Sequence, residues 1–189
     1  MTDGRPISIP VILGTTRHGR MSAHAARFVV GQLEKLQGVT TKLIDIAEMK
    51  IPIDDAGEGI MGPQFSESMT QADAIVIVTP EYNNSFPGLL KHVLDSCLKE
   101  YIHKAAGIVG VSAGSFGGAR VIEHFQPVLR ELGLVSVFWD INFGNVGEVF
   151  DESGTLLDEA YIRRADKFLA ELVWMARVLR HGREQIPLE

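Results

Sequence analysis

Residues 14–22, GTTRHGRMS, follow an apolar run and concentrate side chains that bind anions. These side chains belong to Thr15, Thr16, Arg17, Arg20 and Ser22. The donors of an arginine form a fixed fork that matches phosphate, and a helix beginning here would add unpaired N–H groups and the positive end of its dipole. The stretch is neither G-x-G-x-x-G nor a Walker loop with its lysine, so it favours a terminal phosphate monoester over a bridging pyrophosphate. The alternative is an ordinary helix start, in which Ser22 caps the helix and both arginines face solvent.

Two further polar stretches follow other apolar runs and are suited to holding a planar ring. Residues 79–88, TPEYNNSFPG, contain two prolines that stiffen the chain, and Asn83 and Asn84 tolerate unusual backbone angles. Residues 112–118, SAGSFGG, contain three glycines, which let a flat ligand lie directly on the main chain. Each stretch alone is explained equally well as a strand-to-helix turn. Together with residues 14–22 they favour one binding site.

Apolar runs alternate with amphipathic stretches along the chain. The runs predict strands at residues 7–13, 39–46, 74–79, 106–111 and 135–139. Apolar residues at helical spacing predict helices at residues 22–36, 66–71, 87–98, 119–132 and 156–180. Residues 47–65 and 142–154 are predicted as connections, and Pro10 counts against a continuous first strand because proline has no N–H to donate. This order predicts one parallel sheet covered on both faces, with ligands bound at the carboxyl ends of its strands.

Length and composition indicate one soluble domain. The 189 residues carry a formal net charge of −6, and 46% of them are hydrophobic and 22% charged, as in ordinary globular proteins. We therefore expect a single domain spanning residues 1–189. The 18 Lys and Arg against 24 Asp and Glu speak against a nucleic-acid surface, and no apolar run reaches the roughly 18 residues of a membrane span. A single cysteine, Cys97, excludes a disulfide framework and predicts a cytoplasmic location.

The three polar stretches resemble, in order along the chain, the loops of a known family. GTTRHGRMS, TPEYNNSFPGLLKHVLD and SAGSFGGARV are similar to the signature loops of the NADPH-dependent FMN reductases, which are flavodoxin-like quinone, azo and flavin reductases. The resemblance implies a flavodoxin-like α/β fold, with a doubly wound five-stranded parallel sheet in the order 2-1-3-4-5 and helices on both faces. It also implies bound FMN, with NADPH or NADH as the substrate that delivers a hydride. The electron acceptors would be quinone, azo, flavin or similar small molecules.

The resemblance assigns particular residues to FMN. For the phosphate it implies Thr15, Arg17, Arg20 and Ser22. Along the isoalloxazine ring it implies Pro80, Glu81, Tyr82 and Asn83, mainly through backbone groups. For the other side of the ring it implies Ser112, Ala113, Gly114 and Ser115. Arg20 stands where the family often has a serine.

No catalytic side chain is expected, because FMN carries the chemistry. We expect backbone donors near Asn83 and Gly114 to stabilise negative charge on the reduced ring. No metal is expected either, because the six histidines and the cysteine lack metal-ligand spacing.

The resemblance further implies a homodimer or homotetramer with the flavin near a subunit interface. The aromatic side chains considered for reaching a neighbouring site are those of Phe86, Tyr101, Phe116 and Phe143. The expected partners are therefore further copies of the chain and a small-molecule electron acceptor. Neither nucleic acid nor a membrane is expected.

Three other functions remain open at this point. A flavodoxin-type electron carrier would bind FMN without nicotinamide activity, although such carriers tend to be monomeric and far more acidic than this chain. A nucleotide dehydrogenase would use Asp45, at the end of the second apolar run, to hold a ribose, but the chain lacks G-x-G-x-x-G. A regulatory or scaffold protein would keep the fold without binding flavin, and only flavin-binding measurements exclude it.

Overall fold

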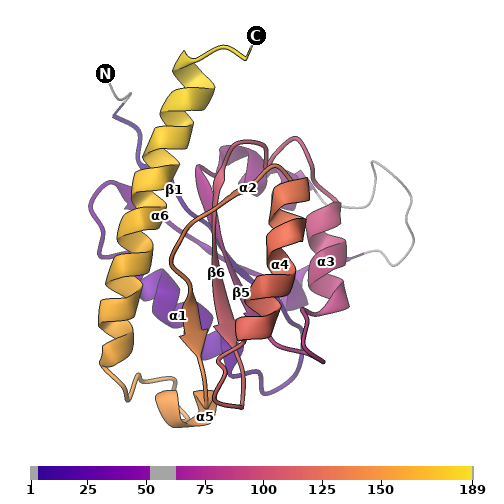
Figure 1. Ribbon diagram of the computed structural model, residues 1–189, viewed down its shortest axis with the longest axis vertical. Coiled ribbons are helices and arrows are strands. Elements are labelled where there is room, and N and C mark those ends of the chain that lie inside the picture. The colour runs from indigo at the N-terminus through magenta and orange to yellow at the C-terminus, as the bar shows by residue number, and fades with distance from the viewer. Residues whose placement is uncertain (1–3, 52–62, 189) are drawn as a thin grey trace.

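Strands and helices alternate along the chain and form a sheet between two helical layers (Figure 1). The computed structural model describes residues 4–51 and 63–188. Its helices are α1 (Ser22–Leu33), α2 (Pro63–Gln71), α3 (Gly88–Asp95), α4 (Ala119–Glu131), α5 (Val146–Val149) and α6 (Ala160–Gln185), with a 3₁₀ turn η1 (Ile46–Glu48). Its strands are β1 (Ile7–Ser8), β2 (Val11–Leu13), β3 (Val39–Thr40), β4 (Leu43–Asp45), β5 (Ala74–Pro80), β6 (Ala105–Val111), β7 (Val135–Ser136) and β8 (Ile141–Phe143). The predicted alternation of strands and helices is confirmed. The predicted connection at 47–65 lies mostly outside the described residues.

All strand pairings in the main sheet are parallel, as predicted. The strands run in the order β4-β2-β5-β6-β7, and β8 also pairs with β6. The predicted strand at 7–13 is divided into β1 and β2, and β1 pairs with β3 in a separate two-stranded ladder. Pro10 lies at this break and accepts a hydrogen bond from the Val76 N–H but has no N–H to donate.

The main sheet contains six strands rather than the predicted five, because β7 and β8 pair with different parts of β6, at Ala105 and Ala106 and at residues 109–111. The run at 135–139 forms only the short β7, and Phe138 turns away from the core with 77% of its surface exposed. The predicted loop at 142–154 begins instead within β8, where Ile141 and Phe143 are buried and pair with β6. Three residues are too few for a period-two pattern to stand out between polar neighbours.

Alternate residues of the central strands enter two separate cores. In β5, Val76 and Val78 face the layer that contains α1 and α6, whereas Ile75 and Ile77 face the layer that contains α2, α3 and α4. Figure 1 shows α1 and α6 on one side of the sheet and α3 and α4 on the other. A run of consecutive apolar residues in a strand is typical of a sheet covered on both faces.

Helix α6 is displaced toward the C-terminus relative to the predicted helix at 156–180. Before it, Phe150 and Leu156 form an isolated antiparallel bridge. Beyond residue 180 the sequence HGREQ has no apolar periodicity, but Arg183 binds Asp73 at 3.1 Å across 110 positions of sequence. The last turns of α6 are thus stabilised by a long-range ion pair that local patterns cannot reveal.

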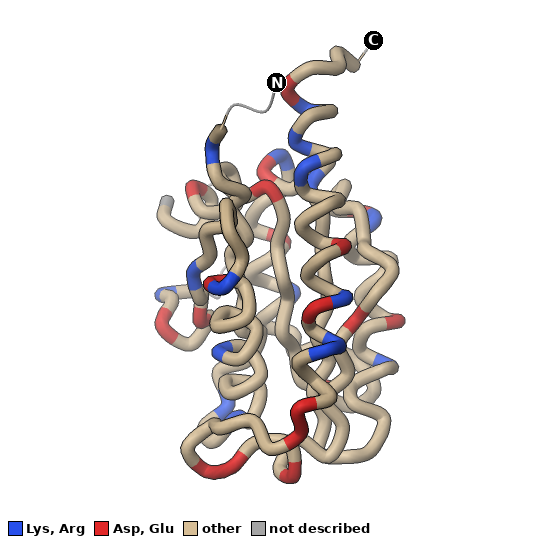
Figure 2. Tube along the Cα trace, turned by 90° about the vertical axis from the view of Figure 1, so that its left-hand side faces the viewer, with Lys and Arg blue, Asp and Glu red and all other residues tan. Residues whose placement is uncertain are grey.

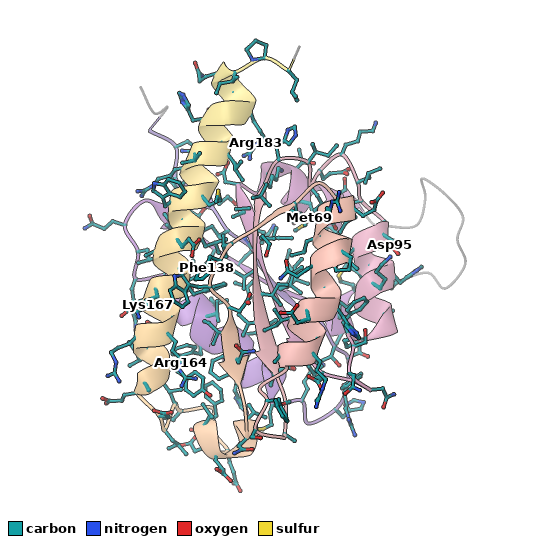
Figure 3. The ribbon with its side chains drawn as sticks, viewed as in Figure 1. Met69, Asp95, Phe138, Arg164, Lys167 and Arg183 are labelled. Atoms are coloured by element: carbon teal, nitrogen blue, oxygen red, sulfur yellow. The ribbon has the colours of Figure 1, made fainter. Side chains whose placement is uncertain are left out.

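Buried charged groups join α6 to the amino end of the sheet, at the top of Figure 1. Asp73, with only 4% of its surface exposed, accepts hydrogen bonds from the Ser8 N–H at 3.0 Å, from Arg180 at 3.3 Å and from Arg183 at 3.1 Å. Lys104 donates to two carbonyl groups near the C-terminal end of α2 at 2.6 and 2.8 Å. Figure 3 labels Arg183 at this end of the molecule. Every atom of the Asp73 carboxylate therefore has a partner within the chain.

Basic and acidic residues are interspersed over the rest of the trace (Figure 2). Within residues 4–51 and 63–188, no helix is both long enough and apolar enough to cross a membrane.

Candidate functional site

The three polar loops predicted to form a site follow β2, β5 and β6. Leu13 of β2 lies opposite Val78 of β5, and Pro80 at the end of β5 lies opposite Val111 at the end of β6. The loops therefore leave the sheet side by side at its carboxyl end, the lower end in Figure 1. A cleft of about 650 Å³ opens there, a volume typical of small-molecule sites. It is lined by Thr15, Thr16, Arg17, Glu81, Tyr82, Asn83, Pro87, Gly88 and Leu89.

Tyr82 connects the first loop to the second. Its hydroxyl lies 2.9 Å from Oγ1 of Thr15, whose side chain is buried. The guanidinium of Arg17 lies 5.8 Å from the centre of the Tyr82 ring, within the range of a cation–π contact. Two of the residues assigned to the phosphate are thus held against a residue assigned to the ring.

Several polar hydrogens at the start of α1 have no acceptor among the described residues. The N–H groups of Gly19, Met21 and Ser22 donate to no other residue of the described chain. Oγ of Ser22 is buried and also lacks a partner there. The alternative in which Ser22 caps the helix is wrong, because Ser22 is the first helical residue and Met21 occupies the cap position without a side-chain bond. Unpaired donors at a helix start suit a phosphate group.

Arg20 is held by Asp45, the last residue of β4. Nη2 of Arg20 forms an ion pair with Oδ2 of Asp45, and both side chains are largely buried. Nε of Arg20 is buried without a partner among the described residues. Oδ1 of Asp45 accepts the Ala47 N–H at 3.0 Å. Because both oxygens of Asp45 are occupied, the geometry gives no support to the dehydrogenase alternative, in which Asp45 holds a ribose.

The second loop is a tight, closed turn. Tyr82 and Ser85 exchange backbone hydrogen bonds of 2.8 and 2.9 Å, and Asn83 and Asn84 between them have φ of 50° and 63°. Both asparagines adopt the left-handed conformation that the sequence predicted they would tolerate. The Glu81 N–H also donates to the Val111 carbonyl at 3.0 Å, which fastens this loop to the end of β6.

The third loop presents bare main chain beside the cleft. Gly118 has φ of 78°, and a Cβ there would lie within 2.9 Å of the Gly110 backbone, so only glycine fits. A Cβ on Gly114 would meet no atom within 4 Å. Four residues are assigned to the far side of the ring, and they are Ser112, Ala113, Gly114 and Ser115. None of them lines the cleft, and they follow the end of the neighbouring strand β6.

An ion pair that the sequence did not predict connects the second and third loops. Nη1 of Arg120, in the first turn of α4, lies 3.0 Å from Oε1 of Glu81, and its guanidinium lies 4.7 Å from the centre of the Phe116 ring. Oε2 of Glu81 is buried without a partner in the described chain. The motif GGAR, with which the helix begins, was the available signal in the sequence, and spacing alone could not identify the partner of its arginine.

Two of the four aromatic residues considered for a subunit contact are misassigned. Tyr101 and Phe143 have no exposed surface, and Phe143 stacks on Tyr161 with ring centres 4.4 Å apart. Phe86 packs against Phe125. Phe116 is the member of the set with a largely exposed ring, at 64%.

The donor set at this end of the sheet fits FMN. The first loop offers hydrogen-bond donors without acceptors, as a phosphate requires, and the second and third loops offer rigid main chain and a surface that a Cβ would fill, as a flat ring requires. No group of three or more metal-binding side chains occurs in the described residues.

Comparison with known proteins agrees with this geometry. Residues 7–146 match the profile of the NADPH-dependent FMN reductases. The chain is 30% identical to an NAD(P)H-dependent FMN reductase of Pseudomonas aeruginosa, over 91% of this chain and 97% of the relative. It is 26% identical to an FMN-dependent NADPH-azoreductase of Staphylococcus haemolyticus, over 86% of this chain and 92% of the relative.

A solved structure supports the same fold. The flavoenzyme FerB of Paracoccus denitrificans, an NAD(P)H:(acceptor) oxidoreductase, superimposes with a TM-score of 0.75 over 90% of this chain and 98% of FerB, at 21% sequence identity.

Proposed function

Because the chain belongs to the NADPH-dependent FMN reductase family, we propose that it is an FMN-dependent NAD(P)H oxidoreductase acting on quinone, azo or flavin acceptors. Bound FMN would supply the chemistry, taking a hydride from the nicotinamide and passing reducing equivalents to the acceptor. The protein binds and orients the ring and tunes its charge. The observation that carries the proposal is the set of donors without partners among the described residues at the start of α1, in the same loop as Thr15, Thr16 and Arg17, which line a cleft of suitable size.

We assign the FMN phosphate to the loop before α1. The residues concerned are Thr15, Arg17, Arg20 and Ser22, with the N–H groups of Met21 and Ser22. Two positive side chains and several uncommitted donors complement a dianion, and the helix dipole adds to them. The hydrogen bond between Thr15 and Tyr82 supports the assignment, because it fixes the Thr15 hydroxyl near the start of this loop.

The isoalloxazine ring is assigned to the second and third loops. The residues concerned are Pro80, Glu81, Tyr82, Asn83, Ser112, Ala113, Gly114 and Ser115. The N–H groups of Asn83 and Gly114 donate to no other described residue, which leaves them available to the ring. Such fixed donors would stabilise negative charge on the reduced ring, because they need no reorganisation when the charge develops.

We further propose a single domain over residues 1–189, a homodimer or homotetramer, and a cytoplasmic location. The exposed Phe116 ring beside the site supports a subunit contact there, because a large exposed aromatic side chain gains free energy when a neighbour covers it. The buried Cys97 thiol agrees with a reducing compartment. Light scattering on the purified protein measures the subunit number.

The experiment that tests the function uses the absorbance of the purified protein. We expect an oxidised-flavin band, either as isolated or after addition of FMN, that bleaches with NADPH or NADH in the absence of oxygen and returns when a quinone is added. A band that ignores both nicotinamides would favour an electron carrier. Absence of flavin binding even in excess FMN would exclude the enzyme and favour a scaffold role.

A further inference from the structure

The ion pair between Arg20 and Asp45 connects the first loop to a strand that carries none of the three loops. Asp45 ends β4, which pairs with β2 so that Asp45 lies opposite Leu13, the last residue before the loop. The side chains of Arg20 and Asp45 are 19% and 13% exposed. Burying such a pair costs desolvation free energy, and the attraction between the partners offsets that cost only if the geometry is good. A pair that is buried beside a binding loop and still leaves one donor unused therefore requires an explanation.

Asp45 is itself fixed in place. Its Oδ1 accepts the Ala47 N–H at 3.0 Å and so begins η1, whose Ile46 side chain is only 1% exposed in the core. The carboxylate consequently has one accessible orientation for Arg20. Arg20 in turn uses Nη2 for Asp45, and its Nε is buried without an acceptor in residues 4–51 and 63–188.

Several groups of this loop that can donate a hydrogen bond have no partner among the described residues. They are Nε of Arg20, Oγ of Ser22 and the N–H groups of Gly19, Met21 and Ser22. Such a set of donors suits a ligand with several acceptor oxygens and a negative charge, as in a phosphate monoester. Arg17 is less constrained, because its recorded contacts are the face of the Tyr82 ring and a long bond of 3.4 Å from its N–H.

We infer that Asp45 is a positioning residue of the phosphate site, which holds the Arg20 guanidinium so that its remaining donors face the FMN phosphate. Asp45 does not touch the flavin and acts through Arg20. The inference rests on the proposed function, because it requires FMN as the ligand. It also explains why an arginine can stand at a position where serine is common in the family, since Asp45 balances its charge and fixes its rotamer.

The direction in which FMN affinity changes when the charge of Asp45 is removed distinguishes a positioning role from simple electrostatic repulsion. The negative charge of Asp45 lies close to the proposed dianion, so electrostatics alone would make its removal strengthen FMN binding. If Asp45 positions Arg20, its removal weakens FMN binding, because the freed guanidinium must be ordered again at a cost in side-chain entropy.

The test compares FMN with riboflavin, which lacks the phosphate, on flavin-free full-length protein. Asp45→Asn keeps the shape of the side chain and an acceptor for the Ala47 N–H, but removes the charge that holds Arg20. We expect a loss of FMN affinity of about tenfold, the order of the coupling between contacting residues, with riboflavin affinity unchanged. Quenching of flavin fluorescence on titration with protein measures both.

Two further variants isolate the pair. Arg20→Gln is expected to lose FMN affinity selectively, and Asp45→Asn is expected to add nothing in the Arg20→Gln background, because positioning requires the arginine. Glu48→Gln is the matched control, since it removes an exposed carboxylate three residues away that has no recorded contact with Arg20. It is expected to leave both affinities unchanged, and the thermal transition of each flavin-free variant establishes that it is folded.

The outcomes separate the inference from the proposed function. Stronger FMN binding by Asp45→Asn, no change, or an equal loss for FMN and riboflavin would each overturn the positioning role. If the unaltered chain binds neither flavin, the proposed function itself fails. If Asp45→Asn does not fold, Arg20→Lys replaces it, because lysine keeps the charge but cannot bind Asp45 and a phosphate through one planar fork; selective loss of FMN affinity is again the expected result.

Discussion

The buried charged groups at the two ends of the sheet differ in how far the chain itself satisfies their hydrogen bonds. At the amino end, Asp73 accepts from a backbone N–H and from Arg180 and Arg183, so its carboxylate is fully used within the chain. At the carboxyl end, buried groups of Arg20 and Ser22 lack partners among the described residues. Unmet hydrogen-bonding capacity costs stability, and a chain retains it where a ligand will meet it. The amino end therefore maintains the fold, and the carboxyl end is available for binding.

The largest expected effect is on stability, from Asp73→Asn. The substitution removes the carboxylate charge that Arg180 and Arg183 share, and breaking a buried ion pair typically costs about 3–5 kcal/mol of unfolding free energy. Urea unfolding measures the loss, and FMN affinity of the folded fraction is expected to remain unchanged.

The matched control is Asp95→Asn. Asp95 forms an exposed ion pair with Lys91 on α3 and is labelled in Figure 3. Its removal is expected to change stability by no more than about 0.5 kcal/mol. If Asp73→Asn lost FMN affinity but kept its stability, the claim that the amino end maintains the fold and the carboxyl end binds the ligand would be refuted.

The next effect in size is on binding, from Gly114→Ala. A Cβ at this position meets no protein atom within 4 Å, so the free energy of unfolding should change little. The same methyl group would occupy the surface assigned to the flavin ring and is expected to weaken FMN binding roughly tenfold, as overpacking commonly does. Fluorescence titration and urea unfolding give the two numbers. Gly118→Ala is the contrasting variant, because its Cβ would collide with the Gly110 backbone and should destabilise the fold.

A smaller effect is expected on the pH dependence of stability, from Asp140, which lies between β7 and β8 at the edge of the sheet. Burial, and then the charges of Glu123 and Glu171, raises the pKa of Asp140 from 3.8 to about 6. An acid whose pKa is raised by folding stabilises the protein below its unfolded pKa, and this stabilisation is lost as the pH rises through its folded pKa. Asp140→Asn should therefore be more stable than the unaltered chain at pH 7, by about 1 kcal/mol because the side chain is only partly buried, and should lose that advantage below about pH 4. Thermal unfolding at the two pH values checks this, and an advantage independent of pH would contradict it.

The smallest effect is expected from Tyr82→Phe, which sharpens the comparison within the carboxyl end. The substitution removes the hydroxyl that bonds Oγ1 of Thr15 at 2.9 Å. A neutral hydrogen bond contributes about 0.5–1.5 kcal/mol, so FMN affinity should fall roughly threefold while the turn at Asn83 and Asn84 is retained. A fall of more than a hundredfold would mean that the phenol contacts the flavin through more than this bond.

Local patterns were sufficient for the layers of the fold. The run AIVIVT was predicted as a strand because its first five residues are apolar, and each of these five side chains is buried in one of the two cores. Local patterns failed where long-range contacts decide the structure. The end of α6 depends on Arg183 meeting Asp73, and β8 depends on pairing with β6.

The site was predictable to the level of loops but not of individual partners. The three motifs lie together at one edge because parallel strands end there together, and this follows from sequence order. Which donors remain free does not follow. The attachment of Arg20 to Asp45, 25 positions along the chain, and of Glu81 to Arg120, 39 positions along, required the folded structure.

Hydrogen–deuterium exchange of the flavin-free protein with and without FMN tests the central claim most directly. We expect FMN to slow the exchange of amides in residues 14–22, 80–85 and 112–115, and to leave the exchange of amides near Asp73 and Arg180 unchanged. Protection concentrated at the amino end, or confined to segments outside the three loops while FMN is demonstrably bound, would contradict it.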